Sequence, residues 1–189
     1  MGKDTQLLGK QGEFFVFHKL LEREITVYAP IFDIEGIDCI IRTPKGKHID
    51  IQVKTRKKEA LFDYRGELSP RSDLYIICHI AEQEKTWVLP SKIFSKFSTK
   101  SKYKGTTLNR LTITKKIRKE LLDYEDDEGF DALVRQAGTG KVKTKSGWQW
   151  LKQKYLQPGA KKIEIRPGMT KNTKEVYKRI QKMQKKMRI

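Results

Sequence analysis

Apolar residues in the first half of the chain recur first with the period of a helix and then with that of strands. Over residues 4–24 they lie three or four positions apart, and Asp4 or Thr5 can serve as an N-cap, so the pattern predicts a helix. Later segments alternate apolar and polar residues or are continuously apolar, and a short helix begins at Pro90. The strands predicted in this way cover residues 25–32, 37–42, 48–55, 74–80 and 86–89.

The second half of the chain has weaker patterns. Residues 57–72 and 99–109 are polar and charged, and we expect loops there. Apolar spacing predicts helices over 111–124 and 130–136, with the acidic residues 125–128 between them as solvated surface. Strands enclosed by helices in this order favour an α/β fold with a mixed sheet flanked by helices.

Two β-branched runs flank a short break, Thr-Pro-Lys-Gly-Lys, centred on Lys45. Pro and Gly between two such runs predict an antiparallel hairpin. With Lys45 at the centre of the turn, Asp38 faces Gln52 and Ile40 faces Asp50. Directly opposed residues have Cβ atoms about 4.5–5.5 Å apart. A register shifted by one residue would move Asp38 to the other face of the sheet.

Polar side chains share one face of the second hairpin strand. Asp50, Gln52 and Lys54 alternate there with apolar residues that face the core. The carboxylate of Asp38 and the amide oxygen of Gln52 are then close enough to bind one hard cation. Glu13 lies on the apolar side of the first helix, where a carboxylate needs such a partner. The alternatives are a solvated polar face with surface ion pairs, and a Glu13 side chain that reaches water at the edge of the apolar stripe.

These residues resemble the motif of the PD-(D/E)XK nuclease superfamily, which includes restriction enzymes, archaeal Holliday junction resolvases and an intron-encoded homing endonuclease. The family has an acid on the first helix, an acid in the second core strand and acid-x-Lys in the third. Glu13, Asp38 and residues 52–54 (Gln-Val-Lys) occupy these places. The chain departs from the pattern at Ile37, where the family has Pro, and at Gln52, where it has an acid. Members with Gln-x-Lys are known, the intron-encoded homing type among them.

The resemblance covers about residues 5–98 and implies a restriction-endonuclease-like mixed β-sheet core flanked by helices. It also implies a DNA endonuclease of the restriction, homing or junction-resolving type that depends on Mg²⁺ or Mn²⁺. Lys54 would orient a water molecule or stabilise charge on the phosphate. The amide at Gln52 favours an alternative, a non-catalytic DNA-binding protein on an inactive nuclease fold. The implied catalytic residues are Glu13, Asp38, Gln52 and Lys54, and the implied metal ligands are Asp38, Gln52, the backbone carbonyl of Val53, and Glu13.

Positive charge is concentrated at the C-terminal end of the chain. The 189 residues have a formal net charge of +18, and residues 141–189 contain sixteen Lys or Arg against two Glu. This asymmetry favours a nucleic-acid partner, here DNA, with single-stranded RNA or a solubilising tail as the alternatives. We expect a nuclease-like core over 1–136, a linker over 137–147 and a nucleic-acid-binding extension over 148–189. The residues expected to bind nucleic acid are Arg56, Lys57, Lys143, Lys145, Trp148, Lys152, Lys154, Lys178 and Arg179.

The remaining features concern location and assembly. The two cysteines, Cys39 and Cys78, lie in apolar strands and are expected to be buried thiols, as in proteins of reducing compartments. No apolar run approaches the ~20 residues of a membrane span. We therefore expect a cytoplasmic or nucleoid-associated protein that is not secreted and has no membrane partner. An apolar stripe on a basic helix predicted over 173–187 favours a homo-oligomer.

Overall fold

The centre of the fold is a five-stranded mixed sheet with the strand order β1-β2-β3-β5-β6. The computed structural model describes residues 3–31, 36–142, 178 and 181. In this part of the chain β3 and β5 run parallel, and the other neighbours in the sheet are antiparallel. The strands are β1 (Val27–Tyr28), β2 (Cys39–Arg42), β3 (His48–Arg56), β5 (Leu74–Ile80) and β6 (Lys85–Pro90). The expected α/β fold with a mixed sheet is confirmed.

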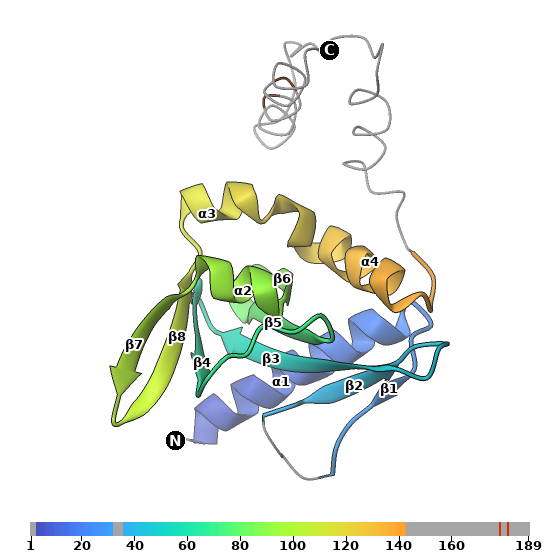
Figure 1. The fold of residues 1–189 in the computed structure, drawn as a ribbon, viewed down its shortest axis with the longest axis horizontal. Helices are drawn as coiled ribbons and strands as arrows, with labels where there is room; N and C mark the ends of the chain where they lie inside the picture. Colours follow the sequence, from blue (N-terminus) through green and yellow to red (C-terminus); the bar gives the residue numbers. More distant parts are fainter. Residues whose placement is uncertain (1–2, 32–35, 143–177, 179–180, 182–189) are drawn as a thin grey trace. The chain divides into compact units, whose positions relative to one another are not determined.

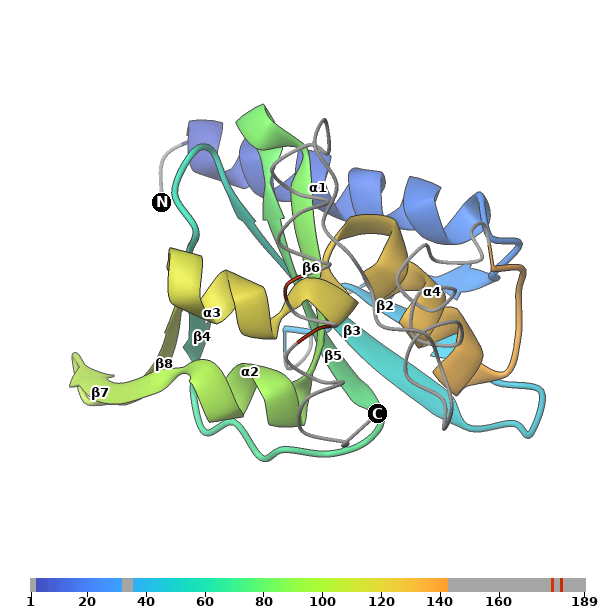
Figure 2. The ribbon, with the colours of Figure 1, turned by 90° about the horizontal axis from the view of Figure 1, so that it is seen from above.

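Helices cover both faces of this sheet, as Figures 1 and 2 show. On one face α1 (Lys3–Leu21) and α4 (Asp126–Ala137) bury Val16 and Phe130 against alternate residues of β2 and β3. On the other face α2 (Ser91–Phe97) buries Phe94 against β5 and β6. All seven residues of β5 are buried, which is the expected pattern for a central strand covered on both faces.

A second, three-stranded antiparallel sheet has the order β4-β8-β7. It corrects the prediction of loops over 57–72 and 99–109. Phe62 of β4 pairs with Leu111 of β8, and both side chains are fully buried. Lys104 and Gly105 form the turn between β7 and β8 with positive φ angles of 48° and 78°. The strands are β4 (Leu61–Arg65), β7 (Thr99–Tyr103) and β8 (Thr106–Thr112).

The helix predicted over 111–124 is shorter, because the first residues of that segment belong to β8. It comprises α3 (Lys115–Glu120), which is followed by the 3-10 turn η2 (Leu122–Tyr124). Another 3-10 turn, η1 (Ala81–Gln83), lies between β5 and β6. Thr114 caps α3 by accepting a hydrogen bond from the Ile117 amide. The helix predicted over 130–136 is confirmed within the longer α4.

The acidic residues 125–128 are less solvated than their sequence predicts. Glu125 is 7% exposed and accepts a hydrogen bond from Nε of Arg118 at 3.2 Å. Asp126 accepts the backbone N–H of Thr86 at 2.9 Å. These carboxylates lie at the start of α4, where the helix dipole and nearby cations both favour negative charge. The partners of Glu125 and Asp126 therefore lie within residues 3–142.

The first helix and the first strand are both shorter than predicted. Helix α1 ends at Leu21 rather than Glu24, because Glu24 adopts a positive φ of 58° that terminates a helix. The strand predicted over 25–32 is confined to β1 in the part of the chain described. The thiols of Cys39 and Cys78 are buried, as expected.

The chain divides into two compact units, Met1–Lys143 and Thr144–Ile189. In the first unit, the start of the predicted linker contacts the core, since the Lys141 amide donates a 2.6 Å hydrogen bond to the Arg23 carbonyl. In the second unit only Lys178 and Gln181 are described, so the expected C-terminal extension lies outside the described residues. Within the described ranges, no helix is both long enough and apolar enough to cross a membrane.

Candidate functional site

The register predicted for the β2–β3 hairpin is the register of the structure. Ile40 lies opposite Asp50, and Cys39 lies opposite Ile51. Asp38 precedes the first residue of β2 and continues the contact, because its amide donates a 2.9 Å hydrogen bond to the Ile51 carbonyl. The hairpin therefore brings Asp38 next to the middle of β3.

The carboxylate of Asp38 is held by the backbone of β3. Its Oδ2 accepts a hydrogen bond from the Val53 amide at 2.6 Å. The N–H and C=O of one strand residue point to the same neighbouring strand. The Val53 carbonyl therefore points to the side of the strand on which Asp38 lies. The Asp38 carboxylate and the Val53 carbonyl, both expected from the sequence to be metal ligands, therefore lie on the same side of β3.

Gln52 precedes Val53 on β3 and has an unsatisfied side-chain oxygen. The side chain is 8% exposed, and its Oε1 is buried with no hydrogen-bond partner in the structure. Its Nε2 packs on Gly36, where a Cβ would overlap it, and Gly36 has a φ of +71° that favours glycine. A buried, unpaired amide oxygen is costly unless something binds it. Gly36 was not predicted as a site residue, although a glycine directly before an apolar strand is the signal that identifies it.

Lys54 projects from the same face of β3 as Gln52. The two residues pair with Cys78 and Ile76 of β5, and both partners belong to the core that covers this face. Burial raises the pKa of the Cys78 thiol, and the Lys54 ammonium opposes that shift, so its charge lies near the sulfur. Lys54 is half-buried. The amide and the ammonium therefore share one partly enclosed face, as predicted.

Glu13 approaches from α1, on the opposite face of the sheet. Its side chain is 16% exposed, and Oε2 lies 2.7 Å from Nζ of Lys10. Burial raises the pKa of the Cys39 thiol, and the charges of Asp38 and Glu13 add to that shift. Both carboxylates are therefore close enough to Cys39 to act on its sulfur, and Glu13 lies near the start of β2.

The oxygen atoms of Asp38, Gln52 and Val53, with the Glu13 carboxylate approaching from the other face, are of the kind that suits a hard divalent cation. Two carboxylates, an amide oxygen and a backbone carbonyl are the oxygen ligands that Mg²⁺ takes together with water and phosphate. The unpaired Oε1 of Gln52 is the donor whose environment fits a bound cation most directly. In the described ranges, no group of three or more His, Cys, Asp or Glu side chains could hold a metal ion.

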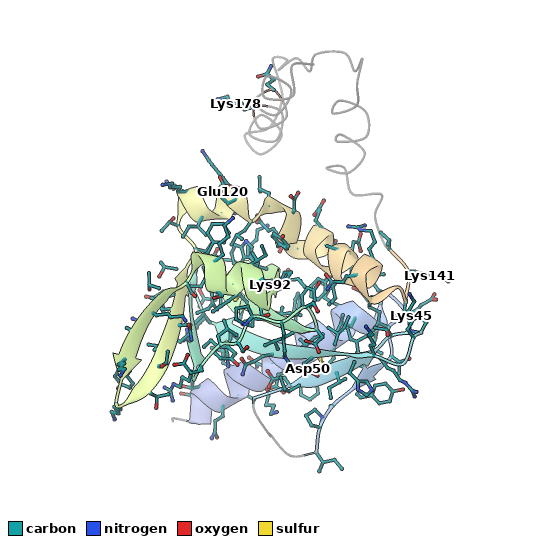
Figure 3. The ribbon with its side chains drawn as sticks, in the orientation of Figure 1. Lys45, Asp50, Lys92, Glu120, Lys141 and Lys178 are labelled. Atoms are coloured by element: carbon teal, nitrogen blue, oxygen red, sulfur yellow. The ribbon has the colours of Figure 1, made fainter. Side chains whose placement is uncertain are left out.

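Asp50 lies on the same face of β3 and is already paired. Its carboxylate contacts Nη2 of Arg71, and its amide donates a 2.7 Å hydrogen bond to the Asp73 carbonyl. Figure 3 marks Asp50 in the central part of the molecule. The guanidinium neutralises this carboxylate, so Asp50 supplies less negative charge to the site than its position in the sequence suggests.

The residues expected to bind nucleic acid are described only in part. Arg56 ends β3, donates a 2.9 Å hydrogen bond from Nε to the Leu61 carbonyl and is 39% exposed. Lys57 is exposed, with Nζ 3.8 Å from Glu82. Lys178 is exposed in the second unit. The other six lie outside the described residues: Lys143, Lys145, Trp148, Lys152, Lys154 and Arg179.

Comparison with known proteins identifies relatives by fold alone. No protein-family model matches the sequence, and no curated protein matches it. Among solved structures, the bacterial homing endonuclease I-Ssp6803I is similar with a TM-score of 0.52 and 18% identity, over 72% of this chain and 97% of that one. D212, a nuclease from a fusselovirus, matches with a TM-score of 0.38 and 14% identity, over 56% of this chain and 83% of that one. The first of these similarities shows that the chain has the fold of a homing endonuclease.

Proposed function

We propose that this protein is a metal-dependent DNA endonuclease with a PD-(D/E)XK-type site in which Gln52 replaces the second acid. The observation that carries the proposal is the buried Oε1 of Gln52, which has no hydrogen-bond partner and lies beside the Asp38–Val53 contact. An oxygen in this position is stabilised by a cation and is otherwise a cost to the fold.

Each residue of the site has a role in phosphodiester hydrolysis. Asp38 supplies negative charge, held in place by the Val53 amide, and Gln52 and the Val53 carbonyl supply neutral oxygen ligands. Glu13 contributes a second carboxylate from α1. Mg²⁺ or Mn²⁺, when bound, supplies Lewis acidity and lowers the pKa of water. Lys54 donates hydrogen bonds to the attacking water or to the developing charge on the phosphate.

The fold supports the same conclusion. The protein shares its fold with a homing endonuclease, and the Gln-x-Lys sequence at residues 52–54 resembles that of homing-type nucleases. Homing is therefore favoured over restriction and junction resolution as the biological context. The substrate implied by this context is duplex DNA.

Basic residues and assembly complete the proposal. Arg56 ends the catalytic strand and Lys57 follows it, so both would contact phosphate near the cut, and the basic C-terminal extension would add sequence-independent affinity. The extension includes Lys178, which is exposed. Cutting both strands of a duplex commonly uses two copies of the site, so the protein is proposed to act as a homo-oligomer. A cytoplasmic or nucleoid-associated location follows from a DNA substrate.

A non-catalytic DNA-binding protein is the second candidate. The neutral amide of Gln52 favours it, because one negative charge fewer weakens the attraction for a cation. The salt link between Asp50 and Arg71 works in the same direction by neutralising another carboxylate on this face. The two candidates differ in whether the protein cuts DNA, and they share the DNA partner.

A cleavage assay decides between them. Supercoiled plasmid, a four-way junction and single-stranded DNA are incubated with the full chain, with and without Mg²⁺ or Mn²⁺. The tested variants are Asp38→Asn, which keeps an acceptor for the Val53 amide but removes the charge, and Lys54→Ala. The matched control is Asp73→Asn, because its carboxylate is 50% exposed and lies outside the site.

We expect metal-dependent cutting by the wild-type chain and by Asp73→Asn, with a loss of at least a hundredfold in Asp38→Asn and Lys54→Ala. Binding of duplex DNA in EDTA should persist in both site variants. Tight binding by the wild-type chain with no cutting of any substrate would establish the non-catalytic candidate instead.

A further inference from the structure

A second basic segment lies in the described core, apart from the C-terminal extension. Residues 91–119 contain ten Lys or Arg and no Asp or Glu. The segment includes α2, the β7–β8 hairpin and most of α3. Acidic residues elsewhere in the core, including those of α4, offset this charge in the average over the core, so composition alone does not reveal it. A local excess of this size attracts a polyanion.

The hairpin of residues 99–112 is the most exposed part of this segment. All five residues of β7 are exposed. Lys100 and Lys102 are two positions apart and therefore share one face of the strand, while Lys104 lies in the turn. In the described part of the chain, no carboxylate lies within ion-pair distance of these three ammonium groups. Their charge is therefore directed to solvent.

An aromatic side chain lies at the tip of the same hairpin. Tyr103 is 55% exposed, and Nζ of Lys104 lies 5.7 Å from the centre of its ring. Large exposed aromatic residues among lysines are typical of surfaces that contact nucleic acid. The packing of the hairpin does not require this ring, since the buried side chains of β8 are Leu108, Asn109 and Leu111.

The hairpin is connected to the proposed catalytic strand. The chain passes from the end of β3 into β4, and β4 pairs with β8. Asp63 of β4 accepts hydrogen bonds from Nε and Nη2 of Arg110 at 2.7 and 3.1 Å, and Nη2 of Arg56 lies 3.6 Å from the same carboxylate. The hydrogen bonds from Arg110 hold the pKa of Asp63 below its usual range, so the link is charged at neutral pH.

The position of the hairpin agrees with this connection. In both Figure 1 and Figure 2 the β7–β8 hairpin extends from the end of the first unit (Met1–Lys143) opposite the β2–β3 turn. Strand β3 runs away from that turn, so Lys54 and Arg56 lie at its end nearer β4. The C-terminal end of β3 and the hairpin therefore lie toward the same side of the first unit.

We propose that the β7–β8 hairpin is a DNA-binding ribbon, in which Lys100, Lys102 and Lys104 contact backbone phosphates of a duplex and Tyr103, at the tip and on the other face of β7, contacts the groove. This inference rests on the proposed function, since it names a surface that holds the substrate of that site. A two-stranded ribbon fits the major groove of B-DNA, and lysine contacts to phosphate position the duplex without reading its sequence. The Arg56–Asp63–Arg110 link holds the ribbon in a fixed relation to β3.

The test measures binding by the full chain without cutting. Fluorescence anisotropy with a labelled DNA duplex, and separately with a labelled single-stranded RNA, is recorded in EDTA between about 50 and 200 mM salt, and log Kd is plotted against log salt concentration. The variant is Lys100→Ala/Lys102→Ala. The matched control, Lys45→Ala/Lys47→Ala, removes two exposed lysines from the β2–β3 turn, and Figure 3 marks Lys45 at the opposite end of the molecule.

Each lost phosphate contact reduces the salt slope by about 0.9, so the hairpin pair should reduce it by about 2 and the control pair should leave it unchanged. Tyr103→Ala should weaken binding by the same factor at every salt concentration, because it removes no charge. Lys100→Gln/Lys102→Gln should reproduce the alanine result, and the melting temperature should show that each variant is folded.

The inference would be overturned if both double variants of the hairpin lysines, to Ala and to Gln, showed the same salt slope as the wild-type chain. It would also be overturned if these variants weakened only the binding of single-stranded RNA. Either result leaves the proposed endonuclease untouched if the wild-type chain cuts DNA. Conversely, if the wild-type chain binds duplex DNA through the hairpin but never cuts it, the inference is supported and the proposed endonuclease activity is contradicted.

Discussion

Gly12 of α1 lies directly against the side chain of Thr55 of β3. A Cβ on residue 12 would overlap Oγ1 of Thr55 and would lie 2.9 Å from its Cβ and 3.0 Å from its Cγ2. This close approach fixes the distance between the helix that carries Glu13 and the strand that carries Gln52 and Lys54. The glycine is therefore a structural requirement of the candidate site.

Gly12→Ala should destabilise the protein by about 1–3 kcal/mol, because the added methyl group forces α1 away from β3. Gly9→Ala is the matched control on the same helix, since no atom lies within 4 Å of a Cβ at that position. The control should stabilise the protein by up to about 1 kcal/mol through helix propensity. Urea denaturation of both variants measures the difference, and equal stability of the two would contradict the proposed contact.

The same contact predicts a rescue. Oγ1 of Thr55 is buried with no hydrogen-bond partner, so Thr55→Ala alone should cost little. In the double variant Gly12→Ala/Thr55→Ala, the overlap with Oγ1 and the close approach to Cγ2 are both removed. The double variant should therefore be more stable than Gly12→Ala, and the double-mutant cycle should give a coupling energy of about 1 kcal/mol or more.

The parts of the fold predicted correctly depend on local patterns. The register of the β2–β3 hairpin follows from the turn at Lys45 and the alternation around Gln52, which are both read within a short segment. Strands β4 and β8 were missed because their pairing joins Phe62 to Leu111 across a long separation in sequence. Polar, lysine-rich strands such as β7 lack the apolar alternation that identifies a strand.

In the candidate site, too, local patterns gave correct predictions and contacts that depend on the folded chain were missed. Alternation correctly places Gln52 and Lys54 on one face, because side-chain direction in a strand depends only on position. The contact between the Asp38 carboxylate and the Val53 amide could not be predicted, because it depends on the end of β2 and on the backbone angles before it. Likewise, Glu125 is buried because Arg118 and Lys85 surround it in the folded chain.

A buried ion pair joins the end of α1 to α4 and should be costly to break. Arg23 and Asp131 are both fully buried, and Nε donates a 2.9 Å hydrogen bond to Oδ1. Asp131→Asn leaves the guanidinium with less compensating charge and should cost about 3 kcal/mol. Asp127→Asn removes a second carboxylate on the same guanidinium, but that side chain is 46% exposed and should cost less than about 1 kcal/mol. Equal losses on urea denaturation would show that burial does not control the energy of this pair.

His79 should make the protein less stable in mild acid. Burial lowers the pKa of His79, against the opposing effects of a hydrogen bond that the ring donates to the Lys85 backbone and of the charges on Asp126 and Glu84. The unfolded chain therefore takes up a proton below about pH 6.5 that the folded chain does not, and stability falls as the pH drops further. Phe15 stacks on the neutral imidazole at 4.2 Å.

The measurement is the free energy of unfolding between pH 7.5 and 5 for the wild-type chain and for His79→Gln. The variant should lose stability at pH 7.5, because it lacks the ring that Phe15 contacts. Its stability should then depend less on pH than that of the wild-type chain. Parallel curves for the two proteins would assign the acid sensitivity to other groups.

Substitution of Gln52 tests the candidate site through two independent properties. Gln52→Glu adds a charge next to Asp38, so half-saturation by Mg²⁺ in the cleavage assay should move to a several-fold lower concentration. Without metal the same carboxylate is buried and unpaired, and stability in EDTA should fall by about 2 kcal/mol. Mg²⁺ should therefore raise the melting temperature of Gln52→Glu more than that of the wild-type chain.

Gln52→Leu is the matched substitution that removes the oxygen and keeps a similar volume. It should abolish cleavage, because a ligand is lost, and it should leave stability in EDTA unchanged or higher, because the buried Oε1 has no partner to lose. A leucine variant that still cuts DNA at the wild-type rate would show that Gln52 is not a ligand. A leucine variant that is strongly destabilised would show instead that the amide has a structural partner.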